Sequence, residues 1–115
     1  MAREVLDGIK GRLAAATPGP WGEFWQGHIH AETGNGTVGI CQTFGPEDRK
    51  HPNAVFIAAA PADVARLTGA LEAVLAECDE MDRRAAQGSN PHAVDRDAGF
   101  IRAAIENALN PKEGQ

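Results

Sequence analysis

The chain has few of the residues that fill large protein cores. It contains no tyrosine, four phenylalanines and two tryptophans among 115 residues. Alanine, by contrast, is abundant, and alanine favours helices while filling little volume. A chain of this length fits one small domain. We therefore expect a single domain over residues 1–115, with a small-residue core that is only marginally stable on its own.

Basic residues are also scarce. Lysine and arginine number 11 against 16 acidic residues, and the formal net charge is −5. Proteins that bind the phosphate backbone of nucleic acids need a positively charged surface, so we expect no nucleic-acid partner. The sequence shows no long apolar run and its start lacks the apolar stretch of a signal peptide. These absences predict a cytoplasmic protein without a membrane partner.

The two cysteines, Cys41 and Cys78, do not form a Cys-x-x-Cys motif or a larger framework. A structural disulfide is therefore not indicated. We expect both to be free thiols that behave as small buried hydrophobic residues.

An amphipathic helix is predicted over Ala2–Ala16, because apolar residues recur there at intervals of three and four. The segment Thr17–Pro20 ends it, since each proline lacks an N–H group and disfavours helix at the preceding residue. The apolar stripe consists of Val5, Leu6, Ile9, Leu13 and Ala16.

A β-hairpin is predicted from Trp21–Glu32 and Thr37–Phe44, with Asn35 and Gly36 at the centre of the turn. This register opposes His30 to Cys41 and His28 to Thr43. A turn at Gly34-Asn35 would change these partners but keep both faces, whereas a bulge would change the faces. Side chains alternate between two faces. The expected core face carries Trp25, Ile29, Ala31, Val38, Ile40 and Phe44. The other face carries Phe24, Gln26, His28, His30, Glu32, Cys41 and Thr43.

The C-terminal half is predicted to be helical. A polar loop over 45–53 leads to a short helix to Ala60, and a corner before Pro61 precedes a central helix to about Arg84. A loop over 85–91 and a last helix over 92–109 follow. The central stripe is Val64, Leu67, Leu71, Val74, Leu75, Cys78 and Met81, with Phe56 and Ala60 leading into it. The last helix is expected to turn inward Val94, Ala98, Ile101, Ile105 and Leu109.

A metal site is suggested on the polar face of the hairpin. His28 and His30 are two residues apart on one strand, with Cys41 opposite, and zinc uses such ligands. Glu32 or His51 would have to complete the site, and the alternative is a polar, half-exposed strand face. Cys41 beside His30 lacks an orienting third group and an oxyanion-hole sequence, so we expect no enzyme and no catalytic residue.

An anion site is the second candidate. Arg49, Lys50 and His51 form the one basic cluster, and a helix start at Asn53 would add free N–H groups. Trp21 could stack on a nucleotide-type ligand, although packing against the N-terminal helix is the competing interpretation. A solvated loop is the alternative interpretation of the basic cluster.

Three stretches carry a resemblance to a known family. They are Leu6–Ile9, the Ala-Ala-Ala-Thr-Pro-Gly-Pro-Trp block over 14–21, and Asn53–Ala60 with Asp63-Val64 and Leu67. Over about residues 5 to 78 the chain resembles the Ead-like early accessory proteins of tailed phages, common in actinobacterial phages and prophages. It departs from them at Pro61 and in its His-rich strand. The resemblance implies a phage protein acting in the host cytoplasm, and it carries over no functional residue.

These observations predict an α+β domain: an N-terminal helix, a β-hairpin that belongs to a larger or intersubunit sheet, and a helical C-terminal half. Because a lone hairpin exposes two edges, we also expect a homo-oligomer. The expected function is non-enzymatic, without a cofactor: binding and modulating a host protein. A counter-defence sponge for a small anionic ligand and a zinc-binding protein or enzyme are the alternatives.

Overall fold

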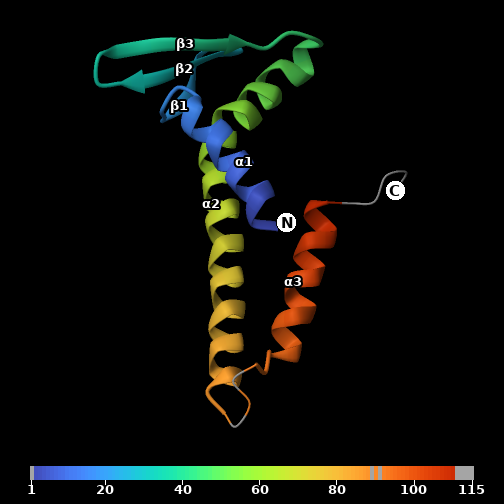
Figure 1. The fold of residues 1–115 in the computed structure, drawn as a ribbon. Helices are drawn as coiled ribbons and strands as arrows, with labels where there is room; N and C mark the ends of the chain where they lie inside the picture. Colours follow the sequence, from blue (N-terminus) through green and yellow to red (C-terminus); the bar gives the residue numbers. More distant parts are fainter. Residues whose placement is uncertain (1, 89, 91, 111–115) are drawn as a thin grey trace. The chain divides into compact units, whose positions relative to one another are not determined.

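The computed structural model describes residues 2–88, 90 and 92–110, and it shows the predicted α+β class (Figure 1). An N-terminal helix precedes three strands, and two helices follow them. The elements are α1 (Ala2–Ala15), β1 (Trp21–Trp25), β2 (His28–Thr33), β3 (Gly36–Gln42), α2 (Glu47–Ala86) and α3 (Arg96–Leu109).

The chain divides into two compact units. Unit 1 consists of Met1–Ile9 and Thr68–Gln115, and unit 2 consists of Lys10–Leu67. Both α1 and α2 therefore contribute residues to each unit. The fold is described below one unit at a time.

Unit 2 contains a three-stranded antiparallel sheet with the order β1-β2-β3. The prediction of one long strand over Trp21–Glu32 is wrong, because the chain turns at Gln26 and Gly27. Gly27 has a φ of 73°, a left-handed conformation that glycine adopts without a steric penalty. The segment therefore forms a hairpin of its own, and the sheet gains a third strand.

The predicted register of the second hairpin is also wrong. Thr33 pairs with Gly36, so the turn lies one residue earlier than predicted and His30 pairs with Gly39. A β-bulge then places an extra residue, Ile40, in β3. Past this bulge, Cys41 lies opposite Ile29 and His28 opposite Gln42, in place of Thr43.

The core face of the sheet is smaller than predicted. Ile29 and Ala31 are fully buried, as expected. Trp25 and Phe44, however, are 70% and 73% exposed. They lie at the end of β1 and beyond the end of β3, away from the centre of the sheet. Val38, on the edge strand, is also exposed, so three of the predicted core residues are surface residues.

Helix α2 is one continuous helix, whereas the sequence predicted a loop over 45–53 and a corner before Pro61. The helix begins at Glu47, where the amide groups of Arg49 and Lys50 donate to the carbonyl of Pro46 at 2.9 and 3.1 Å. Acidic residues in its first turn favour the start of a helix electrostatically. The prolines at 52 and 61 each remove one N–H donor without ending the helix.

By length and composition, α2 is the one helix in the described residues that could cross a membrane. The prediction that the sequence holds no apolar stretch of this kind therefore needs correction. Core helices of soluble proteins pass the same test, so the finding assigns no membrane role.

The core of unit 1 gathers apolar residues from all three helices. Leu6 and Leu75 are 1% and 3% exposed, which confirms their predicted places in the stripes of the first and central helices. Cys78 is buried as a free thiol, whereas Cys41, in unit 2, is exposed and corrects the expectation for that cysteine. The cluster consists of Ala2, Leu6 and Leu75, with Leu71, Ile105 and Leu109 packed against it.

Several predicted stripe residues are exposed instead. Leu67 is 66% exposed and Val94 is 73% exposed. Val94 precedes α3, which begins at Arg96 rather than at residue 92. The Asp95 side chain determines this start, because it accepts a hydrogen bond from the Ala98 amide at 3.0 Å as an N-cap. Val74 and Ile101 are also partly open to solvent.

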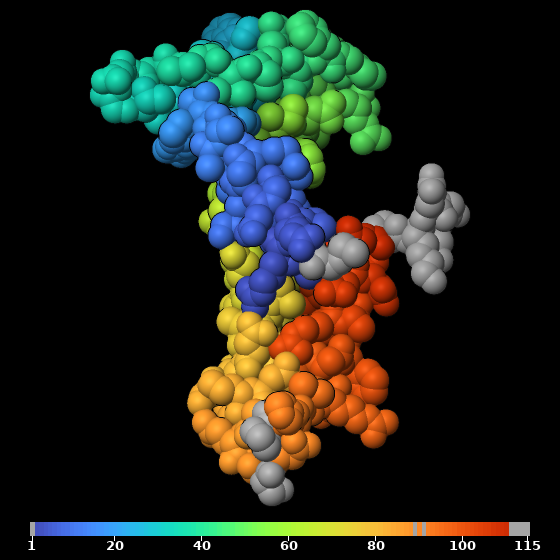
Figure 2. All heavy atoms as spheres, in the orientation of Figure 1, coloured from blue at the N-terminus to red at the C-terminus, as the bar shows by residue number. Residues whose placement is uncertain are grey.

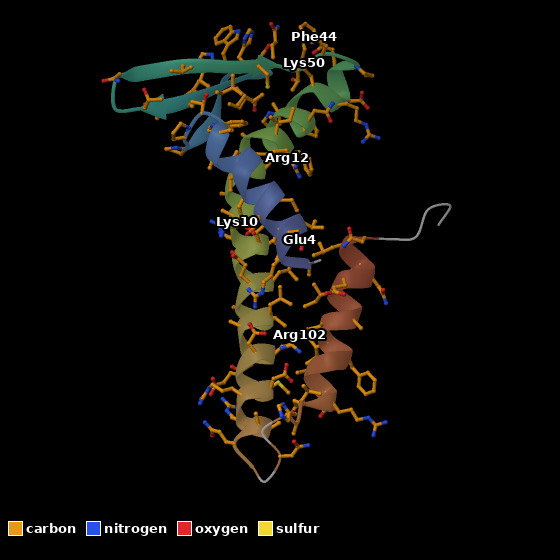
Figure 3. All side chains as sticks on the ribbon, in the orientation of Figure 1. Glu4, Lys10, Arg12, Phe44, Lys50 and Arg102 are labelled. Atoms are coloured by element: carbon orange, nitrogen blue, oxygen red, sulfur yellow. The ribbon has the colours of Figure 1, made fainter. Side chains whose placement is uncertain are left out.

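Charged groups join the helices of unit 1. The Arg102 guanidinium, labelled in Figure 3, lies 2.9 Å from Asp79 and 2.7 Å from Asp82. Asp79 also pairs with Arg3 of α1 at 2.5 Å. Asp82 accepts a hydrogen bond from the Asp95 amide at 2.7 Å. That hydrogen bond and Arg102 lower the pKa of Asp82, and the two carboxylates raise the pKa of Arg102.

We expect Asp95→Ala to lower the free energy of unfolding by about 1 kcal/mol, because the substitution removes the N-cap of α3. Urea unfolding followed by circular dichroism measures the change. Asp97→Ala is the matched control, since it removes the same charge from the first turn but no cap. Equal losses in the two variants would contradict the role given to Asp95.

Asp82→Asn should lower the thermal unfolding temperature at neutral pH. The folded-state pKa of Asp82 is lowered, so its carboxylate stabilises the fold above the ordinary aspartate pKa of 3.8, and this stabilisation is lost as pH falls through the folded-state value. The difference between the native protein and the variant should therefore shrink below pH 3.8. A difference that stays constant with pH would show that the carboxylate charge does not contribute.

Candidate functional site

The predicted basic cluster lies in the first turns of α2, within unit 2. Each of its basic side chains lies near a carboxylate. Arg49, which is 73% exposed, lies 4.0 Å from Asp48. The Lys50 ammonium lies 3.7 Å from Glu47. His51 completes the cluster and pairs with a carboxylate of β1, so the cluster does not form an uncompensated positive patch.

Glu23 is the carboxylate that binds His51. Its side chain is only 14% exposed, and its Oε1 lies 2.5 Å from His51 Nδ1. Its Oε2 accepts a hydrogen bond from the Gly27 amide at 2.8 Å. One side chain therefore connects β1, the following turn and the first turns of α2.

Thr43 makes the second connection at this place. Its amide donates to the Gly27 carbonyl at 2.7 Å, and its hydroxyl donates to the Lys50 carbonyl at 3.0 Å. A Cβ atom on Gly27 would lie 2.8 Å from the Thr43 hydroxyl oxygen. The close approach and the positive φ together require glycine here. We call the five residues Glu23, Gly27, Thr43, Lys50 and His51 the Glu23 corner.

A pocket of about 320 Å³ opens beside the Glu23 corner. It brings together Lys50 and His51, two of the four residues predicted to bind an anion, but it includes neither Arg49 nor Trp21. Two carboxylates accompany the two basic side chains, so the pocket suits a dipolar ligand better than a polyanion. Its lining is Glu23, Gln26, Gly27, Glu47, Lys50 and His51.

Trp21 lines a different, apolar groove of about 340 Å³ in unit 2. The indole Nε1 donates to the Thr17 carbonyl at 2.8 Å, which fixes the ring over the corner between α1 and β1. Leu13 of α1 lies in the same groove, as do small residues of α2. The full lining is Leu13, Ala16, Thr17, Pro18, Gly19, Pro20, Trp21, Ala58, Pro61, Ala62 and Ala65.

The three predicted metal ligands do not share one face of the sheet. Cys41 lies opposite Ile29, and directly opposed residues point to the same face. His28 and His30 flank Ile29 in β2, so they point to the other face. The His30 ring lies 5.7 Å from the Phe24 ring instead. In the part of the chain that the structure describes, no group of three or more His, Cys, Asp or Glu residues could bind a metal.

Aromatic side chains are mostly on the surface. Five of the six in the chain are more than half exposed, and Trp21 is the exception. Phe44 and Phe56 both line an open groove of about 410 Å³. We call this region, with its lining residues Cys41, Gln42, Thr43, Phe44, Asn53, Phe56 and Ile57, the Phe44–Phe56 surface. In Figure 2 the strands and the first turns of α2 form a continuous surface of teal and green atoms.

Sequence reasoning missed Glu23 and the Phe44–Phe56 surface. The sequence signal for Glu23 was the Gln26-Gly27 pair, which follows it by three and four residues and interrupts the strand pattern. Phe44 was assigned to the core because it follows the alternation of β3, and the bulge at Ile40 breaks that alternation. Phe56 was expected to lead into the buried stripe, but it is 76% exposed.

No protein-family model, curated protein or solved structure matches the chain.

We expect Gly27→Ala to lower the free energy of unfolding by more than about 1 kcal/mol, because alanine is strained at this φ and its methyl group would collide with Thr43. Chemical unfolding of the purified protein measures the loss. Gly34→Ala is the control: a Cβ there meets no atom within 4 Å, so the change should stay within about 0.5 kcal/mol. Similar losses in both variants would contradict the role of the Glu23 corner.

Proposed function

We propose that the protein is a non-enzymatic accessory protein, of the phage type that the resemblance implies, which binds and modulates a host protein in the host cytoplasm. The Phe44–Phe56 surface is the proposed contact.

The exposure of the aromatic side chains is the observation that supports this proposal. A soluble chain with six aromatic residues would gain stability by burying them, since each carries a large apolar area. Here Phe44 and Phe56 are 73% and 76% exposed while small residues such as Ala31 and Ala54 are fully buried. Exposed aromatic clusters are typical of protein interfaces, where aromatic residues provide much of the binding energy.

The chemistry of the Phe44–Phe56 surface also favours a protein partner. None of its lining residues is charged. Interface centres are depleted of charged residues and enriched in aromatic ones, and a polar rim surrounds them. Glu47 and Arg49 follow Phe44 by three and five residues and supply charged side chains for that rim. The expected partner therefore presents an apolar patch to Phe44 and Phe56.

The two alternative functions have less support. The pocket beside the Glu23 corner contains Lys50 and His51, but Glu23 and Glu47 line it too and oppose a polyanionic ligand. For zinc, the sheet register separates Cys41 from the two histidines. The anionic sponge and the zinc protein therefore stay predictions from the sequence.

The test compares Phe44→Ser and Phe56→Ser with Phe100→Ser. Phe100 lies in unit 1 and is 61% exposed, so it matches the other two in residue type and in exposure. A host protein captured by the native chain is purified and its affinity for each variant is measured by calorimetry. We expect Phe44→Ser and Phe56→Ser to weaken binding at least about tenfold, as interface anchors do, and Phe100→Ser to leave it within about threefold.

Two results would contradict the proposal. Equal affinities for all three variants would exclude the Phe44–Phe56 surface as the contact. Native mass spectrometry that finds a bound small anion at one per chain would favour the sponge instead, and Lys50→Ala would then remove that added mass.

A further inference from the structure

The outer edge of β3 is open. In the sheet β3 pairs with β2 on one side, and among the described residues no strand pairs with its other side. Six of its seven residues are exposed. An edge strand presents unpaired N–H and C=O groups, which form hydrogen bonds with any compatible strand beside them.

The sequence of β3 does little to prevent such pairing. Natural edge strands are protected by charged residues, prolines, bulges or short length. β1, the other edge, is five residues long, carries Glu23 and contains an irregularity between Glu23 and Trp25. β3 is longer and its one protective feature is the bulge at Ile40. No residue between Glu32 and Glu47 is charged, although charged residues make up 23% of the chain.

The absence of charge identifies the partner strand. When two copies pair about a two-fold axis, each residue near the axis meets its own copy, so a charged residue there would meet a like charge. The chain as a whole carries a net charge of −5 and repels its own copies, so a neutral segment is the part best suited to self-association. β3 satisfies this requirement along its whole length.

Gly39, at the centre of β3, supports the same conclusion. Glycine inside a strand weakens it and often marks the close approach of another backbone. Within this chain nothing requires glycine at residue 39: a Cβ atom would meet no atom within 4 Å, and the φ angle is outside the left-handed region. Full overlap of two copies of Gly36–Gln42 in antiparallel orientation places the axis at Gly39, so that Gly39 of each copy opposes Gly39 of the other.

We propose that the β3 edge pairs with β3 of a second copy of this chain, with the two-fold axis at Gly39, so that two three-stranded sheets become one six-stranded sheet. The pairing segment shares Cys41 and Gln42 with the Phe44–Phe56 surface. The pairing itself requires only this chain, so it is tested without a host protein.

The main test uses charge at the axis. Sedimentation over a concentration series should show that the native protein forms a dimer. Gly39→Lys should weaken the dimer at least about tenfold, because two like charges meet at the axis, whereas the uncharged Gly39→Gln should stay within about threefold. An equimolar mixture of Gly39→Lys and Gly39→Glu should restore a dimer that contains one copy of each.

Three results would overturn the proposal: a native protein that stays monomeric throughout the series, a Gly39→Lys dimer as tight as the native one, or a mixture that does not restore association. None of these measurements includes a host protein, so they leave the proposed function untouched.

Crosslinking keeps the proposal testable if the charged variants fail to fold. Gly39→Cys should form an intermolecular disulfide with Gly39→Cys of the second copy on exposure to oxidised glutathione, because the two-fold axis brings these two positions together on one face of the sheet. Val38→Cys is the control on the same edge, and it should crosslink more slowly because it lies off the axis. Equal rates, or no disulfide from Gly39→Cys, would contradict the register.

Discussion

The shortage of large buried side chains is the constraint that determines this structure. In the described residues, Leu6, Ile29 and Cys78 are the largest side chains that are fully buried. Such small cores provide little hydrophobic stabilisation, since that term grows with the apolar area removed from water. Each unit therefore depends on specific polar contacts between its elements. In unit 2 Glu23 connects the sheet to α2, and in unit 1 Asp82 connects α2 to α3 through Arg102 and the Asp95 amide.

The same constraint explains the surface. The core is formed by alanines and a few aliphatic residues, and the aromatic side chains lie outside it. Phe44 and Phe56 line an open groove, and six of the seven residues of β3 are exposed at the edge of the sheet. The Phe44–Phe56 surface and the β3 edge contain no charged residue, although the chain as a whole is acidic. These are the features on which we base the proposals of a host-protein contact and of strand pairing between copies.

Much of the fold could be predicted from the sequence, because several of the apolar residues that recur at helical spacing are also residues that the helices bury. The stripe through Leu6 correctly predicted α1, and the stripe through Leu71 and Leu75 correctly predicted the core of unit 1. Local patterns failed where one residue decides the outcome. Gly27 turns a predicted strand into a hairpin, and the extra residue Ile40 moves Cys41 to the opposite face from His30. Neither effect produces a periodic pattern in the sequence. The sequence therefore predicted Cys41 on the same face as His28 and His30, whereas the structure places it on the other face.

The central claim is that Trp25, Phe44 and Phe56 are solvent-exposed in the free protein while Trp21 is covered. Hydroxyl-radical footprinting with mass spectrometry measures the reactivity of all four side chains in one experiment. The account predicts fast oxidation of the first three and slower oxidation of Trp21, whose ring lies in the groove beside α1. Uniformly slow oxidation of Trp25, Phe44 and Phe56 in the dilute protein would mean that they form part of a core, and it would contradict the proposed binding surface.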